Sequence, residues 1–157
     1  MHDSQRRDDP AMLDGKGLRV AIVQARFNID ITEQLAAACV EQLRALGAEP
    51  PRLLSVPGAL ELPQALEWLA RDGSCDALVA LGCVIRGETY HFELVCDTSA
   101  AGVQQVALRH GIAVANGILT VEDRQQALQR IDKGAECARV AVEMARLARA
   151  LGARRGV

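Results

Sequence analysis

Aromatic residues are scarce in this 157-residue chain, which has one tryptophan, one tyrosine and two phenylalanines. Because half of the residues are nevertheless hydrophobic, the core must be built from Ala, Val, Leu and Ile. This composition suits parallel strands covered by alanine-rich helices and argues against an all-β fold. The length fits one domain, which we place at residues 16–157.

Excess charge and long apolar runs are also missing. The formal net charge is −2 and the basic residues are scattered, whereas nucleic-acid binding needs a concentrated basic surface. No stretch approaches the ~20 apolar residues that span a bilayer, and residues 1–12 lack the apolar run of a secretory signal. We therefore expect a cytoplasmic protein with no nucleic-acid or membrane partner, and a disordered tail over residues 1–15.

The chain lacks the cysteine and histidine patterns of metal sites. Its three histidines are too few for a histidine-rich site, and its cysteines are odd in number and irregularly spaced, which predicts neither a disulfide framework nor a CxxC site. The five are Cys39, Cys75, Cys83, Cys96 and Cys137. One alternative stays open, because Cys83 or Cys96 could act as a nucleophile activated by the nearby His91.

Several catalytic and nucleotide-binding motifs are absent. The first predicted strand is followed by QARFN, without the glycines that let a backbone approach a pyrophosphate, and no GxxxxGK[ST] string occurs. The chain also contains neither GxSxG nor HExxH. These absences disfavour a nicotinamide oxidoreductase, an ATPase, a serine hydrolase and a zinc protease.

Strand and helix patterns alternate along the chain. Short apolar runs predict strands at residues 18–23, 52–56, 77–85 and 112–119. Helical spacing predicts a first helix capped by Asp30 and ending at Gly47, a second from Pro63 to about residue 71, and others at 90–109 and 123–130. A last helix carries an apolar stripe that needs a sheet or a second subunit to cover it: Cys137, Val140, Ala141, Met144, Leu147, Ala148 and Leu151. The alternation predicts an α/β fold, a three-layer αβα sandwich with a four-stranded parallel sheet.

Residues 81–93, LGCVIRGETYHFE, carry the strongest functional signal. A buried strand is followed by an Arg-Gly loop and then by Thr89, which can cap a helix whose terminal N–H groups favour an anion. His91 in the first helical turn can move protons near neutral pH. This segment therefore predicts an anion site beside an acid/base group at the carboxyl ends of the strands. A structural ion pair between Arg86 and Glu61 is the alternative role for those two residues.

Five strings together resemble the 6,7-dimethyl-8-ribityllumazine synthase family of riboflavin biosynthesis. They are ARFN at 25–28, VPGALELP at 56–63, VIRGETYHF at 84–92, GILT at 117–120 and KG at 133–134. The match extends over about residues 18–151. It implies a flavodoxin-like fold and a transferase that condenses 5-amino-6-(D-ribitylamino)uracil with 3,4-dihydroxy-2-butanone 4-phosphate, releasing phosphate and water, with no metal or organic cofactor.

The resemblance assigns the pyrimidine and its ribityl chain to two loops and a strand end. It implies that Phe27, with Asn28 beside it, stacks on the pyrimidine. The segment that borders the ribityl chain is Ala59, Leu60 and Glu61. The strand end whose backbone reads the pyrimidine edge is Cys83, Val84 and Ile85.

The phosphate is assigned to the same region as the predicted anion site. The resemblance implies a phosphate loop of Gly87, Glu88 and Thr89, with Glu88 pointing away, and makes His91 the proton-transfer residue. Arg130 and Lys133 resemble the cationic wall near the phosphate. Only two residues separate them here, where many members have a longer, glycine-containing connection.

The family forms pentamers with active sites between neighbouring subunits, and its product passes to riboflavin synthase. Asn116 stands where many members carry a phenylalanine that reaches into the neighbour's pocket. Two alternatives remain on sequence alone. One is a flavin- or lumazine-binding, carrier or scaffold protein that has kept the pocket without turnover, and the other is a phosphate-sugar enzyme with a similar sheet.

Overall fold

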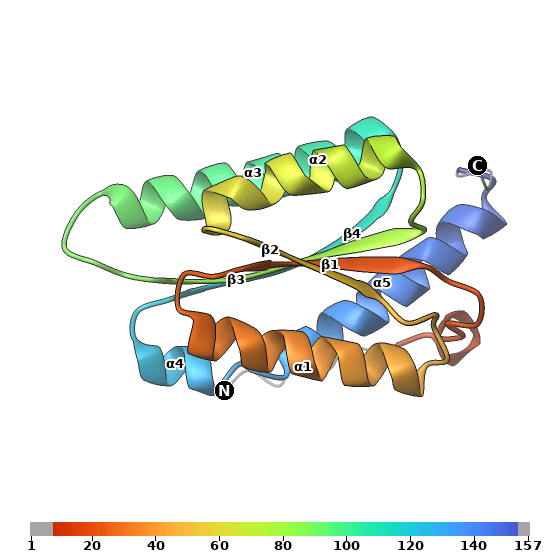
Figure 1. Cartoon of the computed structure of the whole chain (residues 1–157), viewed down its shortest axis with the longest axis horizontal. Helices are drawn as coiled ribbons and strands as arrows, with labels where there is room; N and C mark the ends of the chain where they lie inside the picture. Colours follow the sequence, from red (N-terminus) through yellow and green to blue (C-terminus); the bar gives the residue numbers. More distant parts are fainter. Residues whose placement is uncertain (1–7, 154–157) are drawn as a thin grey trace.

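Four parallel strands form the sheet in the computed structural model, which describes residues 8–153 (Figure 1). They are β1 (Val20–Ala25), β2 (Arg52–Val56), β3 (Ala77–Ile85) and β4 (Ala113–Val121). Their order in the sheet is β2-β1-β3-β4, so the chain crosses over between β2 and β3. The predicted four-stranded parallel sheet is confirmed.

Helices cover both faces of this sheet (Figure 1). One layer holds α2 (Leu62–Asp72) and α3 (His91–His110), and the other holds α1 (Ile29–Ala45), α4 (Arg124–Leu128) and α5 (Lys133–Ala150). Short 3-10 helices occur at Pro10–Met12 (η1) and Ala59–Glu61 (η2). Each face of the sheet has its own apolar core, as a three-layer αβα sandwich of the flavodoxin-like type requires.

The predicted boundaries hold where glycine or proline marks them. The strands predicted at 52–56 and 77–85 match β2 and β3, and Gly73 and Gly111 end α2 and α3 in the left-handed conformation. The predicted cap of the first helix is wrong, because Asn28 and not Asp30 is the N-cap of α1. Asp30 lies in the first turn, where a carboxylate favours the helix dipole.

The predicted tail over residues 1–15 lies partly outside the described residues, so it stays a prediction for residues 1–7. Residues 8–15 lie against the domain. The Asp9 N–H donates to Glu143 Oε1 at 3.2 Å, and the Gly15 N–H donates to the Leu46 carbonyl at 2.8 Å. Within residues 8–153, no helix combines the length and the apolar character needed to cross a membrane.

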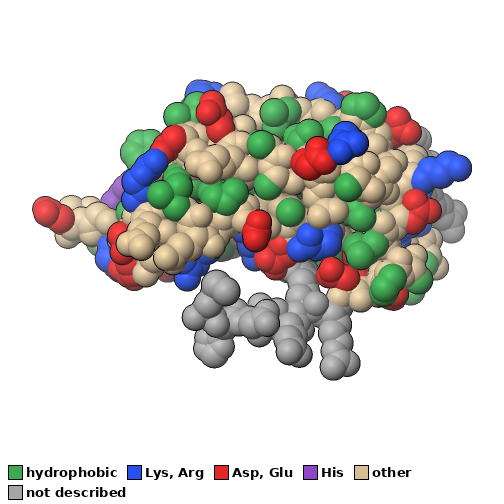
Figure 2. Space-filling view, turned by 90° about the horizontal axis from the view of Figure 1, so that it is seen from below, with side chains coloured by type: hydrophobic (Ala, Val, Ile, Leu, Met, Phe, Trp, Pro, Cys, Tyr) green, Lys and Arg blue, Asp and Glu red, His purple; other side chains and the backbone are tan. Residues whose placement is uncertain are grey.

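The last helix buries its small residues and exposes its large ones. Its buried residues are Gly134, Cys137, Ala138, Ala141, Val142 and Ala145. Met144, Leu147 and Leu151 from the predicted stripe remain 44%, 36% and 74% exposed. Figure 2 shows the face formed by α1, α4 and α5, where apolar side chains lie in small groups between charged ones. The small residues let α5 lie close to α1 and the sheet.

At Gly134, α5 lies in close contact with the backbone of α1. A Cβ atom at this position would overlap the backbone carbonyl of Leu35. We expect Gly134→Ala to lower the free energy of unfolding by about 2–3 kcal/mol, because backbone must move to admit the methyl group. Urea denaturation measures this loss.

Gly87→Ala is the matched control, since a Cβ there meets nothing within 4 Å. It should leave the urea midpoint nearly unchanged. If Gly134→Ala is as stable as the parent chain, α5 and α1 can move apart without loss of free energy of unfolding. Close packing at Gly134 would then not stabilise the fold.

Candidate active site

A cleft of about 370 Å³ lies at the carboxyl ends of the strands, on the side of α2 and α3. Its size suits a small organic molecule. It is lined by residues of the loops after β1, β2 and β3, of the end of β3 and of the first turns of α3: Phe27, Pro57, Gly58, Ala59, Leu60, Glu61, Cys83, Val84, Ile85, Gly87, Thr89, His91, Phe92 and Val95. Most of the predicted site residues therefore meet in one place.

Phe27 stands at the rim of the cleft on the loop after β1. Its N–H donates to the Pro57 carbonyl at 3.2 Å, which continues the pairing of β1 with β2 beyond the strand ends. Its side chain is 72% exposed. A ring this exposed is not part of the core, and it presents a flat apolar surface at the rim of the cleft.

Asn28 fixes the position of the Phe27 loop. It has φ 57°, the only positive φ among the non-glycine residues described, and its carbonyl accepts the N–H groups of Ile31 and Thr32 at the start of α1. Its Nδ2 donates to the Cys83 carbonyl at 2.9 Å. The amide therefore ties the loop to the end of β3, and Asn28 does not itself line the cleft.

The first turn of α3 carries the predicted acid/base group. Tyr90 is the N-cap and makes no capping hydrogen bond with its side chain, whereas the Thr89 hydroxyl accepts the His91 N–H at 3.4 Å. Thr89, which the sequence predicts as the cap of this helix, lies one residue before the N-cap and still accepts an N–H group of the first turn. His91 faces the cleft beside this helix terminus, where partial positive charge gathers.

Arg86 does not pair with Glu61. Its Nε lies 2.5 Å from Glu122 Oε2, and its Nη1 donates to Glu93 Oε1. Its guanidinium lies 4.3 Å from the centre of the Phe92 ring. The two carboxylates raise the pKa of Arg86, and Arg86 lowers the pKa of Glu93. The alternative of an Arg86–Glu61 ion pair is wrong.

The two cysteines near His91 are poorly suited to nucleophilic attack. Burial raises the pKa of Cys83 to about 11. Burial also raises the pKa of Cys96, and the carboxylates of Asp97 and Glu93 add to this effect. Both thiols are therefore protonated near neutral pH, which disfavours the cysteine-nucleophile alternative.

Besides Asn28, four predicted site residues do not line this cleft: Glu88, Asn116, Arg130 and Lys133. The Arg130 guanidinium donates to the Gln126 carbonyl at 2.9 Å, and Lys133 Nζ lies 3.5 Å from Glu136 Oε1. Both belong to the α4–α5 region, in the layer opposite α2 and α3 (Figure 1). Asn116 Oδ1 accepts the Ile118 N–H at 2.9 Å within β4.

Four lining residues were not predicted: Pro57, Gly58, Phe92 and Val95. Pro57 and Gly58 stand directly before Ala59 in the same string. Val95 lies one helical turn after His91, so the i, i+4 spacing places both on one face of α3. Among residues 8–153, no group of three or more His, Cys, Asp or Glu side chains could hold a metal ion.

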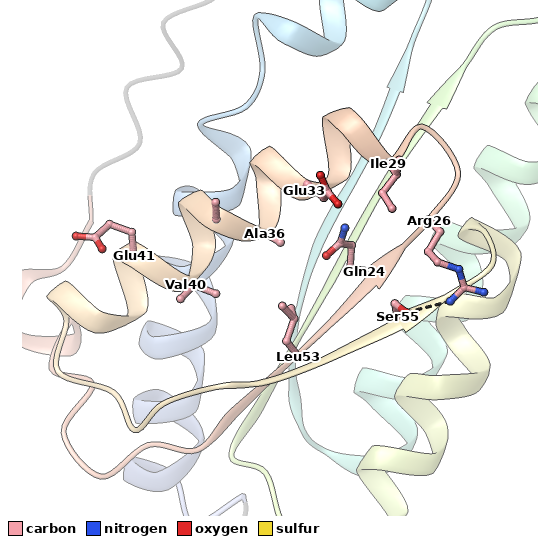
Figure 3. Close-up of a pocket in the computed structure, with 10 residues that line it drawn as sticks. Gln24, Arg26, Ile29, Glu33, Ala36, Val40, Glu41, Leu53 and Ser55 are labelled. Carbon is pink, nitrogen blue, oxygen red and sulfur yellow. Dashed lines mark hydrogen bonds between the residues drawn. The ribbon is translucent and has the colours of Figure 1, made fainter.

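A second groove, of about 590 Å³, lies between α1 and the strands β1 and β2 (Figure 3). Several of its polar side chains are engaged within the chain: Arg26 donates to Ser55 at 2.9 Å, and Gln24 donates to Thr32 at 3.2 Å. Neither a histidine nor a cysteine lines it. The strand-end cleft, which holds His91, is therefore the better candidate for chemistry.

A doubly wound sheet with an acid/base group in the cleft beyond its strand ends is typical of an enzyme acting on small molecules. Comparison with known proteins gives the particular class. Residues 17–149 match the family model described as 6,7-dimethyl-8-ribityllumazine synthase. The chain belongs to this family and is a transferase.

Relatives that carry the same name are similar over most of their length. The protein of Leptothrix cholodnii is 60% identical over 140 residues, covering 87% of this chain and 91% of its own. That of Azoarcus sp. is 55% identical, covering 88% and 91%. That of Cupriavidus necator is 54% identical over 150 residues, covering 94% and 90%.

Asn28 provides a test of the loop geometry. Asn28→Ala loses the amide and strains the left-handed backbone, so it should destabilise the protein by about 1–2 kcal/mol. Asn28→Gly loses only the amide and should cost less, because glycine adopts positive φ readily. Thermal and urea unfolding compare the two. If Asn28→Gly lowered the free energy of unfolding more than Asn28→Ala does, backbone strain would not account for the loss of stability in the alanine variant.

Cys83 provides a test of nucleophilic catalysis. We expect Cys83→Ala to keep lumazine synthase turnover within about threefold of the parent chain, because a protonated thiol contributes packing and not attack. Steady-state kinetics measure the effect, with Cys75→Ala, a buried cysteine outside the cleft, as the control. A loss of several orders of magnitude in the folded Cys83 variant alone would restore the nucleophile hypothesis.

Proposed function

We propose that the chain condenses 5-amino-6-(D-ribitylamino)uracil with 3,4-dihydroxy-2-butanone 4-phosphate to 6,7-dimethyl-8-ribityllumazine, releasing phosphate and water. This is the penultimate step of riboflavin biosynthesis. The observation that carries the proposal is the convergence of three separate motif strings, at 25–28, 56–63 and 84–92, on one cleft that contains His91. The named relatives support the same activity.

The pyrimidine substrate is assigned to the half of the cleft between Phe27 and the end of β3. The exposed Phe27 ring supplies a stacking surface. The Glu61 carboxylate, also in the cleft wall, accepts hydrogen bonds from ribityl hydroxyls. The remaining contacts come from Ala59 and Leu60 at the ribityl chain and from the backbone of Cys83, Val84 and Ile85 at the pyrimidine edge.

The phosphate is assigned to the loop before α3. Gly87 and Thr89 line the cleft there, and the helix terminus that follows favours an anion. Glu88 is exposed and absent from the cleft wall, so it contributes its backbone while its carboxylate stays in solvent. This arrangement avoids opposing two negative charges.

Proton transfers account for the chemistry. The amine of the pyrimidine attacks the ketone and water leaves to give an imine, phosphate is then eliminated, and ring closure with loss of a second water completes the product. His91 supplies and removes protons in these steps. Orienting two reactants in one cleft supplies much of the remaining acceleration, and the sequence of steps requires neither a metal ion nor an organic cofactor.

We further propose a homopentameric unit with active sites between subunits. Arg130 and Lys133 do not line the cleft of their own chain, which supports a role at the cleft of a neighbour. Asn116, exposed on β4, is assigned to the same neighbouring site. The expected compartment is the cytoplasm, and the product would pass to riboflavin synthase.

A binding or scaffold protein that has lost turnover is the second candidate. Asn116 favours it, because this side chain is engaged with its own backbone and cannot provide the flat aromatic surface found at this position in many family members. Binding of the lumazine without its formation would establish this reading.

The decisive experiment mixes the purified protein with both substrates and follows lumazine absorbance and fluorescence. Turnover above the spontaneous reaction is the expected outcome. Folded protein that gives only the spontaneous rate would refute the synthase assignment.

The role of His91 follows from the same assay. We expect His91→Ala to reduce kcat about 10- to 100-fold without abolishing activity, because positioning survives the loss of the proton-transfer group. His110→Ala, at the other end of α3, is the control and should leave kcat nearly unchanged. Complete loss of activity in a folded His91 variant would contradict the expectation that substrate positioning accelerates the reaction without this histidine.

A further inference from the structure

Arg86 makes four contacts around the proposed phosphate loop. Its N–H donates to the Val121 carbonyl at 2.9 Å, at the end of β4. Its side chain bonds to Glu122, directly after β4, and to Glu93 in the first turn of α3. Its guanidinium also lies over the Phe92 ring, 4.3 Å from the ring centre. One residue thus connects the ends of β3 and β4 with the start of α3.

The segment between these contacts is the proposed phosphate loop itself. Residues 87–90 connect Arg86, which directly follows β3, with His91, the first residue of α3. A Cβ atom at Gly87 would meet nothing within 4 Å, so close packing does not hold this loop at its start. The contacts of Arg86 therefore fix where the loop begins and, through Glu93 and Phe92, where the helix after it lies.

The surroundings of Arg86 argue against direct binding of the phosphate. Two carboxylates compensate its charge, and Arg86 does not line the cleft. Phe92, on which it stacks, does line the cleft next to His91. The guanidinium therefore acts on the cleft through the residues that it holds.

We propose that Arg86 is a positioning residue, which with Glu93 and Glu122 sets the loop 87–90 for the phosphate group of the substrate. The proposal rests on the proposed function, since it concerns how that phosphate is held. It predicts that loss of Arg86 weakens phosphate-dependent binding and spares the pyrimidine half of the cleft.

Two variants distinguish a positioning role of the Arg86 guanidinium from an effect of its positive charge alone. Arg86→Met keeps much of the aliphatic chain but forms no ion pair, whereas Arg86→Lys keeps the charge but cannot hold two carboxylates in a planar fork while stacking on Phe92. Arg44→Met, which removes an exposed arginine paired with Glu41 on α1, is the control. Thermal unfolding verifies that each variant is folded.

The readouts are the KM values for both substrates, the affinity for inorganic phosphate by calorimetry, and the affinity for 6,7-dimethyl-8-ribityllumazine by fluorescence. We expect both Arg86 variants to raise the KM for the butanone phosphate and to weaken inorganic phosphate binding about five- to tenfold, equivalent to roughly 1–1.4 kcal/mol. Lumazine affinity should stay within about twofold of the parent chain, as should all values for Arg44→Met.

Three outcomes would overturn the proposal. Normal phosphate affinity in Arg86→Lys would mean that positive charge alone matters. Equal loss of phosphate and lumazine binding would mean that Arg86 supports the whole cleft and not the loop. Absence of phosphate binding in the parent chain would remove the site itself.

The test is independent of the synthase assay. Phosphate and lumazine affinities are measured without turnover, so a parent chain that binds both but forms no product refutes the proposed function alone. If turnover is normal and the Arg86 variants match the parent chain, only the positioning role fails.

Discussion

Parallel pairing of β1 with both β2 and β3 is the constraint on which the site depends. Because the three strands run in one direction and lie side by side, the loops that follow them leave the sheet at the same edge. Residues near 27, 60 and 85, far apart in the sequence, thereby line one cleft. The bond from the Phe27 N–H to the Pro57 carbonyl extends the β1–β2 pairing past the strand ends, and the Asn28 side chain ties the same loop to Cys83 in β3. The cleft is thus a continuation of the sheet and not an addition to it.

The near absence of aromatic residues determines how the layers pack. With so few large rings, the core is filled by close approach of small residues, of which Gly134 against Leu35 is the clearest instance. The glycine that follows Lys133 in the family motif therefore has a packing explanation that needs no ligand. Phe27 and Phe92, the two phenylalanines of the chain, both line the cleft, so the aromatic side chains of this type lie at the site and not in the core.

The parts that could be predicted from the sequence are those governed by local rules. β2 ends at a proline-glycine pair, and α2 and α3 end at glycines with positive φ, so their limits could be recognised directly. The cap at Asn28 could not, because the left-handed conformation of a non-glycine residue depends on its tertiary bond to Cys83. Likewise, the pairing of Arg86 with Glu122 depends on the register of β3 against β4, which no local pattern encodes. The positions of Arg130 and Lys133, away from the cleft of their own chain, depend on how the α4–α5 region packs (Figure 1), which their spacing in the sequence does not encode.

The five cysteines have a practical consequence for experiments on this protein. They are distributed over α1, the turn before β3, β3, α3 and α5, and four of them are buried. A thiol reagent can react with a buried cysteine only when the surrounding structure opens. The rates of labelling at Cys39, Cys83 and Cys137 would therefore report the opening of the core that α1, the sheet and α5 share. The native chain thus carries its own reporters of local unfolding, with no need to introduce a probe by mutation.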